Sequence, residues 1–222
     1  MSNDKLKELA AIEASKLIPR SGIIGIGTGS TVKFLIKIMS EKYQLYKNNQ
    51  FVPTSLETEK LLSNGNLTVI DDFTGKILMD FDGADEINPV GDLIKGGGGA
   101  LTREKIVAAN SEKFIVIADE TKIVNRLGKF KVPVEIVPFL HSKTLEKIES
   151  LGGITQKRKH GKEISDNGNI LADADFGIIE DPGLLEREIK MITGVVEVGL
   201  FTNMASQSII GTEEGIINKK YK

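Results

Sequence analysis

The 222-residue sequence contains no cysteine. Disulfide bonds, thiolate catalysis and cysteine-ligated zinc are therefore excluded, and the composition is compatible with a reducing compartment. Only two histidines are present, His141 and His160, and neither lies near a motif. We therefore expect both to be surface residues rather than an imidazole base or a metal ligand.

Long apolar runs and an excess of one charge are also absent. No stretch approaches the ~18 apolar residues of a membrane-spanning helix, and the amphipathic start MSNDKLKELAA does not read as a signal peptide. The net charge is −2, from 29 basic and 31 acidic residues, so no basic field would attract nucleic acid or an anionic membrane. We expect a cytoplasmic protein with neither partner. The 40% hydrophobic content can bury one sizeable core, or a core plus a smaller lobe.

A strand, a glycine-rich turn and a helix follow one another near the N-terminus. The apolar residues 23–26 lead into GIGTGST, residues 25–31, and helix-spaced apolar residues follow. This order predicts the first half of a parallel α/β unit. The turn lacks the lysine of a Walker A loop, and Ser30 replaces the third glycine of GxGxxG. With the hydroxyls of Thr28, Ser30 and Thr31, it suits a phosphate or sugar hydroxyls; a tight turn with one capping hydroxyl is the alternative.

Two aspartates follow an apolar run further along the chain. Residues 77–81 predict a strand, and Asp82 and Asp85 come directly after it in the motif DGADEI. Open α/β sheets place their ligand sites at the carboxyl ends of their strands. We therefore expect both carboxylates at the site, with turn or capping carboxylates as the ordinary alternative.

A lysine and a run of four glycines come next. Lys95 opens the run at residues 96–99, and a helix pattern then carries Glu104 near its start. Glycine N–H groups can approach a ligand closely, and φ can be positive. Because four ordered glycines give up much chain entropy, we favour a binding loop over a flexible surface loop. Lys122 follows another predicted strand, at residues 114–118, and is either a substrate contact or a solvated lysine.

These residue types allow proton transfer next to a carbonyl group. One carboxylate can abstract the proton, a lysine ammonium can stabilise the enediolate oxygen, and a second carboxylate can move the hydroxyl proton. This is aldose–ketose isomerisation, which needs neither a metal nor nicotinamide. Two alternatives stay open: Glu104 could be a first-turn acid favoured by the helix dipole, and Asp82 and Asp85 could hold Mg²⁺ with a substrate phosphate.

Periodicity predicts the remaining elements of the first part of the chain. A helix near the N-terminus stops at Pro19 because proline cannot continue it. Residues 43–53 are polar and predict a connector, whereas residues 67–70 predict a strand. Residues 206–210 predict one more strand, which returns to the first sheet.

The second part of the chain has a different order of strand and helix patterns. Its strand and helix patterns follow the order β-α-β-β-α-β, with a hairpin turn at residues 166–169 and one strand at residues 195–201. The predicted fold class is α/β. A Rossmann-like, mostly parallel sheet domain, residues 1–130 and 205–222, carries the site, and residues 131–204 form a smaller ferredoxin-like α+β lobe.

The segments GIGTGST, DGADEI, KGGGGALTREK, DNGN, GVVEVGLF and IIGT together closely resemble ribose-5-phosphate isomerase of the A type, over nearly the whole chain. The resemblance implies interconversion of D-ribose 5-phosphate and D-ribulose 5-phosphate, in the non-oxidative pentose phosphate pathway, without metal or cofactor. It also implies a homodimer or a homotetramer. The unrelated B type uses a cysteine, which this chain lacks.

The resemblance assigns roles by motif. Glu104 would be the general base that moves the proton between C1 and C2, Asp82 would assist ring opening or hydroxyl proton transfer, and Lys95 would stabilise the enediolate. The residues that would line the substrate site are Thr28, Gly29, Ser30, Thr31, Asp82, Gly83, Ala84, Asp85, Lys95, Gly96, Gly97, Gly98 and Lys122. Which loop holds the phosphate stays open.

Two other functions use a similar architecture. A non-catalytic sugar-phosphate sensor in a transcription regulator would need an attached DNA-binding helix pair with a basic face, and we expect two lobes to leave no room for one. A sugar-phosphate deaminase or lactonase would share the fold rather than the motifs, and a fold alone does not establish function.

Overall fold

The computed structural model describes residues 1–159 and 163–221. Their contacts form two units, which we describe separately. The sheet unit consists of Met1–Gly83, Arg103–Lys122 and Met204–Lys222, and the lobe unit consists of Ala84–Thr102 and Ile123–Asn203. The domain boundaries expected from the sequence, residues 1–130 with 205–222 and residues 131–204, stay a prediction.

The sheet unit is built on a six-stranded sheet in the order β13-β12-β6-β3-β1-β2. Its strands are β1 (Gly22–Ile26), β2 (Asn49–Pro53), β3 (Ile77–Asp82), β6 (Phe114–Asp119), β12 (Gln207–Thr212) and β13 (Gly215–Lys220). All neighbours pair in parallel except β12 and β13, which are antiparallel. From β1 the chain continues to β2 on one side and then to β3 on the other. The carboxyl ends of β1 and β3 therefore form a topological switch point, where such sheets place ligands.

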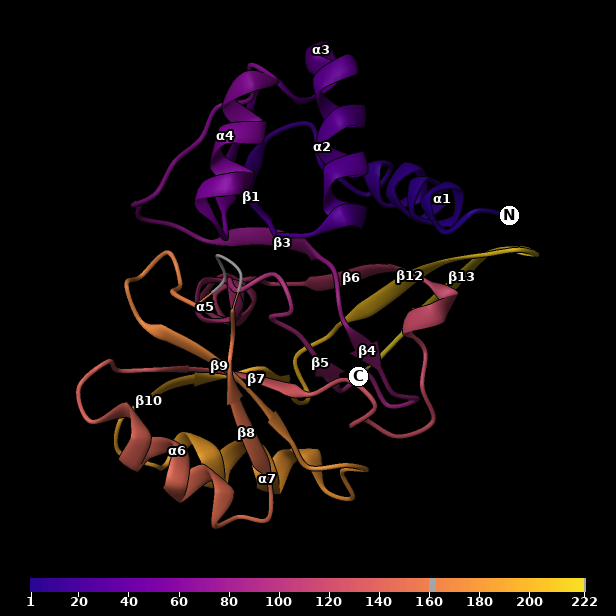
Figure 1. The fold of residues 1–222 in the computed structure, drawn as a ribbon. Helices are drawn as coiled ribbons and strands as arrows, with labels where there is room; N and C mark the ends of the chain where they lie inside the picture. Colours follow the sequence, from indigo (N-terminus) through magenta and orange to yellow (C-terminus); the bar gives the residue numbers. More distant parts are fainter. Residues whose placement is uncertain (160–162, 222) are drawn as a thin grey trace. The chain divides into compact units, whose positions relative to one another are not determined.

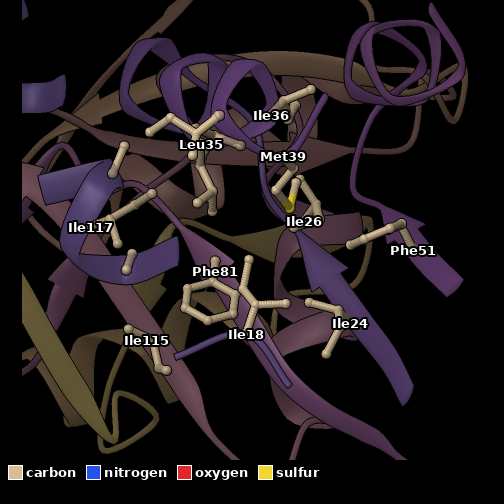
Figure 2. Packing of buried hydrophobic residues seen from close by; sticks show 14 of the residues in the cluster. Ile18, Ile24, Ile26, Leu35, Ile36, Met39, Phe51, Phe81, Ile115 and Ile117 are labelled. Atoms are coloured by element: carbon tan, nitrogen blue, oxygen red, sulfur yellow. The ribbon is translucent and has the colours of Figure 1, made fainter. Parts of the chain in front are cut away.

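Helices cover both faces of this sheet, as parallel strands require. They are α1 (Asn3–Ser15), α2 (Ser30–Glu41), α3 (Tyr43–Tyr46), α4 (Leu56–Asn64) and α5 (Leu101–Ala109), with the 3₁₀ turn η1 (Glu120–Lys122). Side-chain alternation along β1 explains the two layers. Ile24 and Ile26 join a buried cluster with Leu35 of α2 (Figure 2), whereas Ile23 packs in a second cluster with Val107 of α5. These observations confirm the Rossmann-like class and the return of β12 to the first sheet.

Two expectations for this unit are wrong. Residues 43–53, expected to be a connector, contain α3 and the edge strand β2, whereas residues 67–70 make one isolated bridge, from Val69 to Phe51. The β2 sequence reads as polar because an edge strand tolerates exposed side chains. Gln50 is exposed, while Phe51 is fully buried.

The lobe unit contains a four-stranded antiparallel sheet in the order β10-β7-β9-β8. Its elements are β7 (Val132–Ile136), α6 (His141–Glu149), β8 (Ile154–Lys157), β9 (Ile170–Asp175), α7 (Pro182–Lys190) and β10 (Val195–Val198). Both helices lie on one face of this sheet (Figure 1), where Ile148 and Ile189 join the buried cluster of Val134 and Ile136. The element order and the strand order confirm the ferredoxin-like arrangement.

The strand expected at residues 195–201 is interrupted at Gly199. After β10, the short strand β11 (Leu200–Phe201) leaves the lobe sheet and pairs with β5 (Leu93–Ile94), which also pairs with β4 (Glu86–Ile87). The expectation of one strand is therefore wrong.

Among the described residues, no helix is both long and apolar enough to cross a membrane.

Gly199 makes the change of sheet possible. Its N–H donates to the carbonyl oxygen of Pro133 at 2.7 Å, and its own carbonyl accepts from the N–H of Lys95 at 2.8 Å. A Cβ at this position would lie 2.3 Å from the Lys95 carbonyl oxygen, so the close approach of the two backbones requires glycine. The break places the Phe201 ring beside the side chain of Lys95, the residue that follows β5.

Candidate active site

The turn after β1 is built against Asp82, the last residue of β3. The Asp82 side chain is fully buried, and its Oδ1 accepts from the N–H of Thr28 at 3.0 Å and from the N–H of Gly83 at 2.7 Å. Gly27 lies beside the same carboxylate, because a Cβ there would be only 1.9 Å from Asp82 Cγ. The turn and Asp82 therefore orient each other, and the lack of a side chain at Gly27 permits the contact.

Replacing Gly27 by alanine should lower the free energy of unfolding by about 1–3 kcal/mol, because the new methyl group overlaps a buried carboxylate. Urea unfolding of the variant and the wild type measures the difference. Gly83→Ala is the matched control, since the atoms nearest to its added Cβ outside the adjoining residues lie at 3.9 Å. Equal stability of the two variants would contradict the tight packing at Gly27.

The hydroxyl of Thr28 belongs to a hydroxyl cluster at the ends of β1 and β2. Its Oγ1 lies 2.9 Å from Thr54 Oγ1 and 2.7 Å from Ser55 Oγ. Thr58 Oγ1 lies 3.2 Å from the same oxygen and donates to the carbonyl of Gly27 at 2.7 Å. Sequence reasoning missed Thr54, Ser55 and Thr58 as neighbours of the turn, because it did not recognise β2, whose carboxyl end places them there.

The turn continues into the N-terminus of α2. Gly29 has φ = +138° and precedes the first helical residue, Ser30, whose side chain is exposed, whereas Thr31 is buried. An ideal Cβ at Gly29 would have no atom within 4 Å, so space is open beside it. The N–H groups of a helix's first turn have no intrahelical acceptor, and the helix dipole favours an anion there. The turn therefore suits a phosphate group.

Lys122 lies near the same edge of the sheet. It is the last residue of η1, which follows the carboxyl end of β6, and its side chain is half-buried. Asp119, the last residue of β6, shapes this turn by accepting from both the N–H and the hydroxyl of Thr121. The sheet unit thus gathers the glycine turn, Asp82 and the segment of Lys122 at the carboxyl ends of three neighbouring parallel strands.

Glu104 lies in the first turn of α5, and its residue is only 2% exposed. A carboxylate is favoured at this end of a helix by the dipole. Gly25 lets α5 approach β1 closely, since a Cβ there would be 2.4 Å from Val107 Cγ1. The acid predicted as the base is therefore held, largely away from solvent, on a helix that packs directly on the first strand.

Lys95 is a buried cation of the lobe unit. It is 2% exposed, its backbone is held by Gly199, and its ammonium lies 5.3 Å from the centre of the Phe201 ring. A cation is attracted to the face of an aromatic ring, and more strongly where water is excluded. Sequence reasoning missed Phe201; the GVVEVGLF motif was a signal, but the strand break that places the ring is not apparent in it.

The glycine run after Lys95 is ordered by its backbone and by Asp85. Gly96 and Gly99 have φ values of +99° and +92°, a region that other residues rarely adopt. Asp85 Oδ2 accepts from the N–H of Gly97 at 2.8 Å, and a Cβ on Gly97 would lie 2.7 Å from Asp85 Oδ1. Gly98 is exposed. The run is therefore a defined loop, with Asp85 as one of its organisers.

A buried carboxylate that was not predicted, Glu135 of β7, organises the DNGN segment. Its Oε1 accepts from Ser165 Oγ at 2.8 Å, from Asn167 Nδ2 at 3.1 Å and from Asn169 Nδ2 at 2.8 Å. Its Oε2 accepts from Thr102 Oγ1 at 2.6 Å, in the first turn of α5. Four donors from two distant segments thus meet on one fully buried carboxylate.

The described residues contain no group of three or more histidine, cysteine, aspartate or glutamate side chains arranged to hold a metal ion. The predicted residues instead divide into two sets. The sheet unit holds residues 28–31, Asp82, Gly83, Glu104 and Lys122, and the lobe unit holds Ala84, Asp85, Lys95 and residues 96–98. Each set combines acidic and basic side chains with a glycine-rich backbone.

A mostly parallel sheet with a glycine turn and a buried aspartate at its switch point defines a Rossmann-like α/β protein, and the switch point is where such folds bind small anionic ligands. Residues 50–215 match the family model described as ribose 5-phosphate isomerase A (phosphoriboisomerase A). The chain therefore belongs to the ribose 5-phosphate isomerase A family, as the sequence motifs predicted.

Individual relatives are similar over nearly their whole length. The chain is 49% identical over 210 residues to ribose-5-phosphate isomerase A of Picrophilus torridus, covering 94% of each chain. It is 47% identical over 215 residues to that of Bacillus mycoides, covering 95% of this chain and 97% of the relative. A solved D-ribose-5-phosphate isomerase in complex with phospho-erythronic acid has a TM-score of 0.95 at 36% identity, covering 99% of this chain and 100% of the other. The enzyme of Methanocaldococcus jannaschii has a TM-score of 0.93 at 37% identity, with the same coverage.

Proposed function

We propose that this protein interconverts D-ribose 5-phosphate and D-ribulose 5-phosphate through an enediolate, with Glu104 as the base that moves the proton. Membership of the ribose 5-phosphate isomerase A family carries the isomerase activity. The burial of Glu104 and Lys95 supports their roles, because charged groups shielded from water act more strongly on developing charge.

The reaction begins with the open-chain aldose. Glu104 removes the proton from C2, and the electron pair of that bond forms the enediolate while the aldehyde oxygen gains negative charge. The ammonium of Lys95 stabilises this oxygen. Asp82 moves the hydroxyl proton from O2 to O1, and Glu104 returns its proton to C1, which leaves the ketone at C2. In the same scheme, Asp82 assists opening of the sugar ring.

The substrate contacts we propose are residues 28–31, 82–85 and 95–98, together with Lys122. The open space at Gly29 and the N-terminus of α2 support residues 28–31 as a phosphate site. The other candidate for the phosphate is the glycine run at residues 96–99. The relative solved with phospho-erythronic acid supports a phosphorylated sugar as the ligand.

The family resemblance also leads us to propose a homodimer or a homotetramer that acts in the cytoplasm without metal or cofactor. Light scattering coupled to size-exclusion chromatography distinguishes the two assemblies. A monomer at assay concentration that is fully active would contradict this part of the proposal.

The wild-type protein, incubated with ribose 5-phosphate in D₂O with a chelator, tests the reaction. We expect ribulose 5-phosphate with some deuterium at C1, because a carboxylate that carries the transferred proton can exchange it with solvent. Loss of activity with the chelator and recovery with Mg²⁺ would instead make Asp82 and Asp85 metal ligands. Binding without turnover would indicate a sensor, and ammonia release from glucosamine 6-phosphate would indicate a deaminase.

A further inference from the structure

We propose that Arg158 is a positioning residue that holds the glycine loop, residues 96–99, in the conformation that the reaction requires. This inference rests on the proposed function, because it takes the loop after Lys95 to be part of the substrate site. Arg158 itself would not contact the substrate. It would act through the loop backbone.

The guanidinium group of Arg158 is buried and paired. Arg158 follows directly after β8, and its side chain is 7% exposed. Its Nε lies 2.9 Å and 3.0 Å from the two carboxylate oxygens of Asp173 on β9, and its Nη2 lies 2.5 Å from Oδ1. Such a two-pronged pair is geometrically specific, and it neutralises the arginine charge. The pair with Asp173 therefore fixes the direction of the remaining nitrogen, Nη1. It does not leave Arg158 as a free cation for the substrate.

That remaining nitrogen, Nη1, donates to the loop. It lies 3.0 Å from the carbonyl oxygen of Gly96 and 3.5 Å from that of Gly97. The N–H of Gly97 belongs to the same peptide unit as the Gly96 carbonyl, and it donates to Asp85 at 2.8 Å. One planar peptide is thus held at its oxygen by a cation and at its N–H by an anion, which fixes the orientation of its plane.

This restraint matters because glycine residues restrict their own backbone least, and it adds to the bond within the loop from the Gly99 N–H to the Gly96 carbonyl at 2.9 Å. Glycine has the largest backbone freedom of any residue, and four occur in succession. Lys95 immediately precedes Gly96, so a shift of the loop can be transmitted to the residue proposed to stabilise the enediolate. A misplacement of about 1 Å can reduce a rate by about 100-fold. Asp173 lies on β9 and Arg158 directly follows β8, so the lobe sheet would serve as a rigid support for the loop.

Arg158→Ala tests the proposal, with Arg126→Ala as the matched control. Arg126 also pairs with a carboxylate of the lobe unit, Glu180, but both side chains are largely exposed. We expect Arg158→Ala to lower kcat for ribose 5-phosphate isomerisation by about 10–100-fold, and Arg126→Ala to leave it unchanged. Guanidinium ion at non-denaturing concentration should restore part of the activity of Arg158→Ala only, because it can enter the space left beside Asp173 and Gly96.

Two further measurements separate positioning from a purely structural role. Hydrogen exchange at the Gly97 amide should accelerate in Arg158→Ala but not in Arg126→Ala. Arg158→Lys keeps a charge near Asp173 but cannot span all the acceptors, so it should recover only part of kcat even where its Tm equals that of the wild type. This variant also provides the test if Arg158→Ala does not fold.

The outcomes are distinguishable. An inactive wild type would contradict the proposed function, and unchanged exchange at Gly97 in folded Arg158 variants would then contradict the positioning role as well. An active wild type with folded Arg158 variants that match Arg126→Ala in kcat and in Gly97 exchange would overturn the inference alone. A lower Tm without a change in kcat of the folded protein would likewise assign Arg158 to stability only.

Discussion

Replacing Glu104 by glutamine is expected to lower kcat for ribose 5-phosphate isomerisation by about 10²–10⁴-fold, the usual contribution of a positioned general base. Glutamine has nearly the same shape as glutamate, but its amide cannot accept a proton from carbon. Because Glu104 is only 2% exposed, bulk water is poorly placed to replace it. KM should change little, since the carboxylate acts mainly on the transition state.

Steady-state kinetics and proton exchange together check this expectation. Deuterium incorporation at C1 in D₂O should fall with kcat, because both depend on the same base. Glu112→Gln, a change of the same chemistry at a half-exposed residue paired with Lys76, is the control and should keep wild-type activity. Full activity of Glu104→Gln with an unchanged Tm would assign the proton transfer to another group.

Replacing Lys95 by methionine is expected to lower kcat by about 10²–10³-fold, the effect of removing one donor to a developing oxyanion. Methionine keeps most of the side-chain volume, and its sulfur can contact the Phe201 ring that now faces the ammonium. The variant should therefore fold with its charge removed and its packing largely kept. Lys95→Arg should not restore the rate, because the planar guanidinium is larger and carries its charge differently.

The changes in kcat and in KM of Lys95→Met together show which role Lys95 has. A fall in kcat with little change in KM indicates an interaction made in the transition state. A rise in KM with unchanged kcat would instead indicate uniform binding, as expected for a lysine that holds the phosphate. Lys131→Met is the control, because Lys131 is exposed and lies 3.9 Å from Asp175 in the same unit.

The sequence by itself determined where the candidate site residues lie in the secondary structure. The glycine turn between β1 and α2, the aspartate at the end of β3 and the acid in the first turn of α5 were all predicted at their observed places. These features depend on neighbouring residues: apolar periodicity, turn-forming glycines and helix starts act over a few positions. The same local patterns predicted the β-α-β-β-α-β order of the lobe.

Only the tertiary structure decided which distant segments meet. The edge strand β2, the change of sheet at Gly199 and the four donors on Glu135 join parts of the chain that local periodicity treats separately. Arg158 is the clearest case, because it reads as an ordinary surface cation in the run QKRK, yet it donates to the backbone of a loop 61 and 62 residues away in sequence. Strand pairing and burial create such contacts, and each depends on the whole fold rather than on the residues beside it.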